Sequence, residues 1–191
     1  YGPLFQGVRD AFAAQGVEAI YTHLEPAGYG SFCADAGLDG MILTSPLLTE
    51  LDNLHQLMGE GIIYVAASMS SHTAADSDLP CVDSDNVQGA YDAVSHLLAL
   101  GHRHVGIVNL ATSQANHHDR LEGYKRALSD SGLLTRLGDL LLYPIHDEPR
   151  MEERIEEWLR QSEAQGDLPT ALFCCDYLMT LATLRVLRRR G

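Results

Sequence analysis

The chain has 191 residues, of which 46% are hydrophobic, enough for a real core in one large domain or two small lobes. Its 26 acidic residues outnumber 13 Lys and Arg, and the formal net charge of −13 disfavours nucleic-acid binding by this stretch itself. The sequence holds no apolar run of transmembrane length and opens on no signal segment, so we expect no membrane partner.

Apolar segments alternate with helical patterns along the whole chain. Most are continuously apolar, which is typical of strands covered on both faces in a parallel α/β sheet. The predicted strands are 17–24, 40–45, 62–68, 81–85, 104–110, 140–145 and 170–176. The predicted helices include 3–16, 47–59, 86–101, 119–132 and 151–161, and the chain closes on another. This alternation predicts βαβ units with right-handed crossovers.

Several motifs that would indicate catalysis or a cofactor fail on inspection. The stretch GYGSFC at 28–33 starts like a dinucleotide fingerprint, but Cys33 stands where the third glycine belongs, so we interpret it as a loop. No GxSxG elbow or phosphate-binding GxxxxGK[ST] occurs. The four cysteines lack zinc spacing and are interpreted as reduced, buried thiols of a cytoplasmic protein. We therefore expect no enzyme activity, cofactor or metal.

Two polar clusters deserve weighing. His117 and His118 lie in NHHDR, but adjacent helical residues diverge by about 100°, so a polar loop leading into a helix is favoured over a metal site. Asp83 and Asp85 follow a predicted strand, where open α/β sheets bind ligands. Asp85 equally fits the N-cap of the following helix, and the residues alone leave both interpretations open.

Three segments together resemble the effector-binding domain of LacI/GalR-family transcriptional regulators. The matching residues are Val82, Asp85, Asn86, Gly89, Ala93, His96, Leu97, Gly101, His102 and Arg103, then Arg120, Gly123, Tyr124, Ala127 and Leu128, and finally Pro169, Thr170, Ala171, Phe173 and Asp176. The stretch LDGMIL at 38–43 is also similar to a family motif. The most specific element is the helix–Gly-His–strand join around Gly101.

The resemblance implies two similar Rossmann-like lobes with parallel sheets, a periplasmic-binding-protein-like type I fold. It places residues 1–102 in the N-terminal lobe, without its first strand, and 103–191 in an incomplete C-terminal lobe. A short crossover at the Gly-His join would act as a hinge strand. The DNA-binding headpiece of the family is expected to lie outside this sequence.

The resemblance further implies a small-molecule effector, a sugar at family level, bound between the lobes of a homodimer that controls operator DNA. Asp85 and Arg120 would contact it, since a carboxylate and a guanidinium fork suit vicinal hydroxyls or a carboxylate. The further candidate ligand-binding residues are Asp176, Ser45, Ser68 and His146. The family's Asn-Asp pair is Cys175-Asp176 here, so one polar group is lost.

The sequence is also compatible with two other classes of function. A periplasmic sugar-binding protein of a transport system shares the two-lobed fold, and the reading frame upstream of Tyr1 would separate it from a regulator. An α/β enzyme is the least supported class, because no catalytic constellation is found.

Overall fold

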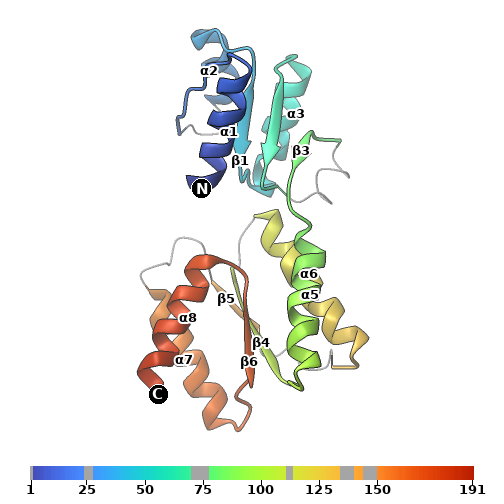
Figure 1. The fold of residues 1–191 in the computed structure, drawn as a ribbon, viewed down its shortest axis with the longest axis vertical. Helices are drawn as coiled ribbons and strands as arrows, with labels where there is room; N and C mark the ends of the chain where they lie inside the picture. The colour runs from blue at the N-terminus through green and yellow to red at the C-terminus, as the bar shows by residue number, and fades with distance from the viewer. Residues whose placement is uncertain (1, 24–27, 70–77, 111–113, 134–139, 144–149) are drawn as a thin grey trace. The chain divides into compact units, whose positions relative to one another are not determined.

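The computed structural model describes residues 2–23, 28–69, 78–110, 114–133, 140–143 and 150–191 (Figure 1). The chain divides into two compact units, Tyr1–Leu38 and Asp39–Gly191. The second unit holds two separate three-stranded parallel sheets, which confirms the α/β class predicted from the alternating pattern.

The first unit contains the helices α1 (Gly2–Ala14) and α2 (Tyr29–Ala36). The strand predicted at 17–24 is wrong, because the described residues 17–23 form no strand. They follow α1 instead: the Tyr21 hydroxyl donates to the carbonyl of Phe5 at 3.1 Å, and the two rings meet edge to face. A strand needs a neighbour for its backbone groups, and the described part of this unit offers none.

The loop predicted over GYGSFC is also wrong, because α2 covers most of it. The helix ends at Gly37, whose φ of 61° is the left-handed conformation that glycine adopts without strain. The two glycines at 28 and 30 suggested a loop, and the helix is too short to show a clear hydrophobic periodicity. Cys33 is its buried residue.

The first sheet has the order β1-β2-β3, built from β1 (Met41–Thr44), β2 (Tyr64–Ala67) and β3 (Cys81–Val82). Between β1 and β2 lie the short 3-10 helix η2 (Leu48–Glu50) and α3 (Leu51–Gly59). Leu54 and Leu57 are the buried residues of α3. Three of the predicted strands therefore form here in register, all with their carboxyl ends at one edge.

The second sheet has the order β5-β4-β6, with the longest strand in the middle. Its strands are β4 (Val105–Leu110), β5 (Leu140–Tyr143) and β6 (Ala171–Cys174). Its helices are α5 (Asn86–Ala99), α6 (Ala115–Asp130), α7 (Met151–Ala164) and α8 (Tyr177–Arg190). Figure 1 shows α5 and α6 on one face of this sheet and α7 and α8 on the other.

The packing of α5 differs from the division expected at residues 102 and 103. Val94 and Leu98 of α5 lie in the same buried cluster as Ile107 of β4 and Leu128 of α6. The apolar face of this helix therefore finds its partners in the second sheet. We propose that the C-terminal lobe begins at residues 83–86, before α5, rather than at the Gly-His join.

The Gly-His join itself fastens the end of α5 to the start of β6. Gly101 adopts a φ of 98°, and the Arg103 guanidinium donates to the Leu98 carbonyl at 3.0 Å. The His102 ring contacts the Thr170 hydroxyl at 3.0 Å, and the Thr170 amide donates to the His104 carbonyl. The tight turn with two histidines and an arginine thus holds a helix end and a strand start together.

The close approach of α5 and α6 depends on one residue without a side chain. A Cβ at Gly123 would overlap the carbonyl oxygen of Val87 and lie 2.8 Å from the Ala90 Cβ. The two helices make the most extensive contact between elements of the described chain. Gly123 is therefore a packing requirement of this helix pair.

We expect Gly123→Ala to destabilise the protein by about 1–3 kcal/mol, because the methyl group overpacks the α5–α6 contact. The matched control is Gly89→Ala on α5, where nothing lies within 4 Å of the added Cβ. That variant should be stabilised by about 0.5–1 kcal/mol through helix propensity. Urea unfolding followed by circular dichroism measures both, and equal free-energy changes would contradict the packing role.

Candidate functional site

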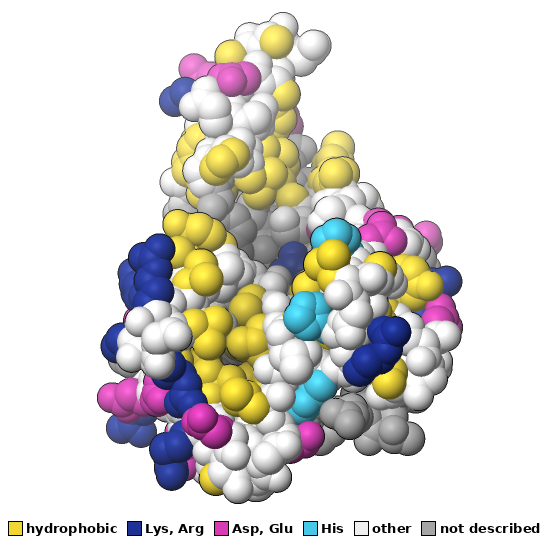
Figure 2. Space-filling model, turned by 60° about the horizontal axis from the view of Figure 1, so that its bottom comes forward, with side chains coloured by type: hydrophobic (Ala, Val, Ile, Leu, Met, Phe, Trp, Pro, Cys, Tyr) yellow, Lys and Arg dark blue, Asp and Glu magenta, His cyan; other side chains and the backbone are white. Residues whose placement is uncertain are grey.

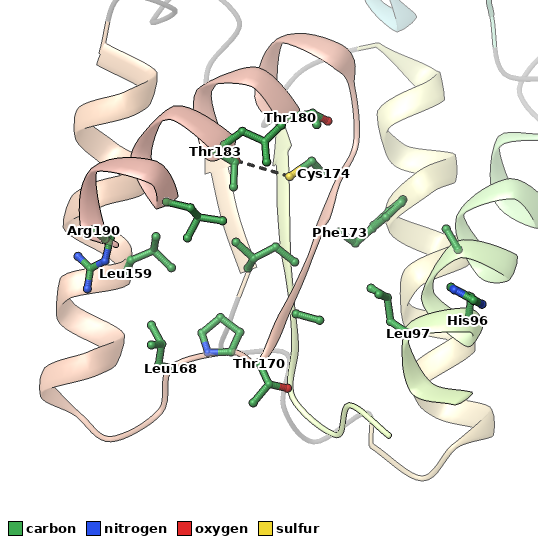
Figure 3. A pocket seen from close by; sticks show the side chains of 16 residues that line it. His96, Leu97, Leu159, Leu168, Thr170, Phe173, Cys174, Thr180, Thr183 and Arg190 are labelled. Carbon is green, nitrogen blue, oxygen red and sulfur yellow. Dashed lines mark hydrogen bonds between the residues drawn. The ribbon is translucent and has the colours of Figure 1, made fainter. Parts of the chain in front are cut away.

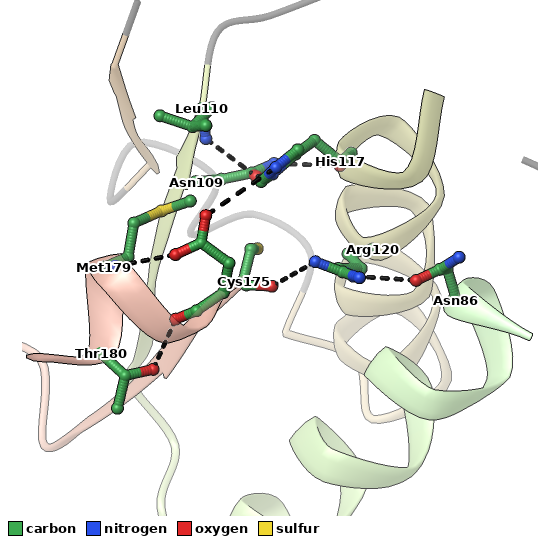
Figure 4. A network of polar contacts seen from close by, with 9 residues as sticks. Asn86, Asn109, Leu110, His117, Arg120, Cys175, Met179 and Thr180 are labelled. Atoms are coloured by element: carbon green, nitrogen blue, oxygen red, sulfur yellow. Dashed lines mark hydrogen bonds and ion pairs between the residues drawn. The ribbon is translucent and has the colours of Figure 1, made fainter. Parts of the chain in front are cut away.

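Polar side chains gather at the carboxyl end of the second sheet (Figure 4). Asn109 lies near the end of β4, and Asp176 lies two residues after the end of β6. His117 and Arg120, one helical turn apart on α6, face the same region. Carboxyl ends of parallel strands are where open α/β sheets bind ligands, so this group is the candidate site.

Arg120 joins three elements through its guanidinium. Its Nε donates to the Asn86 side-chain oxygen at 2.9 Å, and its Nη1 donates to the Cys175 carbonyl at 2.5 Å. These bonds link α6 to the start of α5 and to the segment after β6. Arg120, which we expect to bind the ligand, therefore also holds these segments together. Its Nη2 takes part in neither bond.

Asn86 connects Arg120 to Asp83 in the crossover that follows β3. Its side-chain amide donates to Asp83 Oδ2 at 2.7 Å, and the side chain is only 6% exposed. Burial raises the pKa of Asp83, while the Ser84 amide and the nearby Arg120 act in the opposite direction. The chain Asp83–Asn86–Arg120 therefore runs from the end of the first sheet into the second.

His117 is buried, with 4% of its surface exposed. Its Nδ1 lies 2.8 Å from Asn109 Oδ1, and the Asn109 amide donates to the His117 carbonyl at 3.1 Å. Its Nε2 faces Asp176 Oδ2 at 4.0 Å. Burial, followed by the nearby Arg120 charge, lowers the pKa of His117 to about 4. The ring is therefore neutral at pH 7.

The two aspartates predicted to bind ligand both cap helices. Asp85 accepts from the Gln88 amide at 2.9 Å as the N-cap of α5, and Asp176 accepts from the Met179 amide at 2.8 Å as the N-cap of α8. For Asp85, the interpretation as a helix cap is confirmed. Each cap uses Oδ1 alone, which leaves Oδ2 of both side chains outside the capping bond.

Ser45 and Ser68 lie at the carboxyl end of the first sheet, directly after β1 and β2. The paired residues Thr44 and Ala67 precede them, so the two serines end neighbouring strands. Their φ values of 52° and 59° lie in the left-handed region that non-glycine residues seldom adopt. Such backbone positions occur preferentially at functional sites. His146, the remaining candidate, lies outside the described residues.

Sequence reasoning missed three residues of this network. Asn109, Asn86 and His117 are all buried. The polar loop predicted at NHHDR is wrong, because α6 begins at Ala115 and contains this stretch. A signal for His117 was present, because it lies three residues before Arg120 and so shares its helix face. Cys175, which replaces the family's asparagine, is buried and contributes its backbone carbonyl to Arg120.

A cavity of about 580 Å³ lies along β6 between α5 and α8, and Thr180 at one end of its lining also bonds to the Asp176 carbonyl (Figure 3). Apolar side chains dominate its walls, including Leu97, Phe173, Leu184 and Leu187. Figure 2 shows hydrophobic side chains in this hollow, with basic side chains along one rim. In the described residues β6 pairs with β4 alone, so its other edge is unpaired there. The cavity runs along this edge and is not built around converging polar groups.

Within the described ranges, no cluster of His, Cys, Asp or Glu has the makings of a metal site. The helices described here are also all too short or too polar to span a membrane.

A family model described as periplasmic binding proteins and sugar binding domain of LacI family matches residues 5–191. The chain belongs to this family. Catabolite control protein A of Priestia megaterium is 30% identical to it over 165 residues, which cover 81% of this chain and 44% of that relative. The HTH-type transcriptional repressor PurR of Haemophilus influenzae (strain PittEE) is 26% identical over 174 residues, 91% of this chain and 47% of the repressor.

This LacI-family chain thus spans about half the length of the curated relatives it matches. Solved structures share its fold. The transcriptional regulator CelR–cellobiose complex has a TM-score of 0.81 at 24% identity, covering 100% of this chain and 57% of that one. A LacI family regulator from Enterococcus faecium with bound ribose has a TM-score of 0.74 at 22% identity, covering 98% and 66%. The predicted periplasmic-binding-protein-like type I fold is confirmed.

The lowered pKa of His117 predicts a stability that depends on pH. Its folded pKa of about 4 lies below the ordinary value of 6.5, so the unfolded chain takes up the proton first as pH falls. Stability from the neutral ring is fully present above pH 6.5 and is lost as pH falls towards 4. The loss is about 3 kcal/mol at most.

Chemical denaturation at a series of pH values measures this effect as a slope. His117→Phe should flatten the slope between pH 6.5 and 4, while His118→Gln on the exposed neighbour should keep it. Parallel slopes in wild type and His117→Phe would show that His117 titrates normally.

Proposed function

We propose that this chain is the ligand-sensing and dimerisation domain of a LacI-type transcriptional regulator, which binds a small molecule, a sugar by class, to control DNA binding. The observation that supports it most is the polar group of Arg120, Asp176 and His117 at the carboxyl strand ends of the second sheet. The compared relatives are named as transcriptional repressors, which favours a regulator over a transport protein and over an enzyme.

A sugar is the proposed ligand because hydroxyl groups both donate and accept hydrogen bonds. Arg120 Nη2 supplies donors, and Asp176 Oδ2 supplies an acceptor. Ser45 and Ser68 offer a second set of hydroxyls at the edge of the first sheet, and Asp85 Oδ2 stands beside the crossover. Two similar structures hold cellobiose and ribose, which agrees with this ligand class.

Regulation then follows from differential affinity. A ligand that contacts the strand ends of both sheets binds better to one arrangement of the two lobes, and the population shifts towards that arrangement. In a cytoplasmic homodimer this shift would change the spacing of the operator-binding headpieces. A mobility-shift assay of the full-length protein on its own promoter, with and without a panel of sugars, tests the proposal. Operator binding that no sugar alters would contradict it.

Arg120→Ala should weaken sugar binding about 10- to 100-fold, because a hydrogen bond to a charged group contributes roughly 1.5–3 kcal/mol. It should also lower stability, since the guanidinium holds Asn86 and the Cys175 carbonyl. Arg126→Ala is the control. Arg126 is on the same helix, but its guanidinium lies over the Tyr91 ring and not in the polar network. Calorimetry at a temperature where both variants are folded gives the affinities, and unchanged binding by Arg120→Ala would exclude it from the site.

A further inference from the structure

The protonation of the His117 ring can be assigned from its partner. Asn109 Oδ1 accepts from the Leu110 amide at 2.9 Å, while the other end of the same side chain, Nδ2, donates to the His117 carbonyl. The atom 2.8 Å from His117 Nδ1 is therefore an amide oxygen, which can only accept. Nδ1 must carry the hydrogen, and in the neutral ring Nε2 carries a lone pair.

This lone pair faces a second acceptor. Nε2 and Asp176 Oδ2 are 4.0 Å apart, too far for a hydrogen bond. Asp176 Oδ1 is occupied by the Met179 amide, so the carboxylate cannot turn without breaking the cap. Among the described residues, Nε2 makes no hydrogen bond, and the side chain as a whole is 4% exposed. Its lone pair is therefore an acceptor that a donor group of a ligand could use.

The spacing suits one shared donor. An atom about 2.8 Å from both acceptors, a normal hydrogen-bond length, lies between them at close to a right angle. A hydroxyl satisfies one acceptor at a time, and an amino group has enough hydrogens for both. A carboxylate or phosphate oxygen at the same point would meet a lone pair and a negative charge.

The charges around His117 and Asp176 also disfavour an anion at this point. Asp83 and Asp119 lie close enough to influence one another, and Asp176 adds a further carboxylate near His117. Arg120 is the nearby cation, and two of its nitrogens already donate to Asn86 and Cys175. The potential around the pair is therefore unfavourable to an added anion.

We propose that His117 is a specificity-determining residue of the ligand site: with Asp176 it forms a double acceptor that binds a hydroxyl or amino group of the ligand and rejects a carboxylate or phosphate at that point. This inference rests on the proposed function, because it concerns the same site. It adds the polarity of the ligand group and a residue that the sequence analysis had placed in a polar loop.

The first test needs no ligand. Nitrogen-15 NMR of the full-length protein with labelled histidine distinguishes a protonated from an unprotonated ring nitrogen, and His117→Phe assigns the signal. We expect Nδ1–H with unprotonated Nε2, unchanged from pH 8 to pH 5.5. A protonated Nε2, or titration near the ordinary histidine pKa of 6.5, would overturn the inference.

The second test uses matched probes: ribose, cellobiose and glucosamine against ribose 5-phosphate, glucose 6-phosphate and gluconate. Calorimetry should show wild type binding a neutral or amino sugar at least tenfold more tightly than the anions. His117→Phe, which keeps a ring but no nitrogen, should weaken that binding about tenfold, while His118→Gln should not.

The outcomes separate the two proposals. Preference for an anionic probe, or a neutral sugar bound equally by wild type and a folded His117→Phe, contradicts the role of His117 and leaves a sugar-sensing domain intact. Wild type that binds none of the six probes contradicts the sugar function, and the ligand role of His117 falls with it.

Discussion

The close contact between α5 and α6 is the constraint on which the arrangement of this domain depends. Gly123 lets the backbone of α6 approach the Val87 carbonyl of α5, and one turn earlier Arg120 reaches the Asn86 side chain. The same contact draws α5 into the core of the second sheet through Val94 and Leu98. A glycine in one helix therefore permits the close helix pair in which α5 packs on the second sheet and Arg120 is held beside Asn86.

The site combines structural and binding duties in the same side chains. Asp176 caps α8 with one carboxylate oxygen and presents the other to the network, and Arg120 holds two segments through Nε and Nη1. Sharing of this kind fixes the geometry of the binding groups before a ligand arrives, since a side chain held by its own fold loses little freedom on binding. Buried Asn109 extends the principle by holding the ring of His117 in one tautomer.

Periodicity and composition were enough to predict most of the regular structure. The strands from 40–45 onward all appear, because continuously apolar segments between helical patterns are buried on both faces in a parallel sheet. Two errors lie in the first unit, at residues 17–23 and in GYGSFC, and a third is the loop predicted at NHHDR, which belongs to α6. A strand without a partner cannot satisfy its backbone, and a short helix of eight residues offers too few positions for a clear pattern.

The sequence by itself determined the fold class, the family and the positions of Asp85 and Asp176 after strands and of Arg120 on a helix, because these follow from local patterns and short motifs. Only the tertiary structure decided what those residues do. Hydrogen-bond partners such as Asn86 and Arg120, or His117 and Asn109, are separated in the chain and meet through packing. Their burial and protonation depend on that packing, and no pattern along the chain records the distance between two side chains.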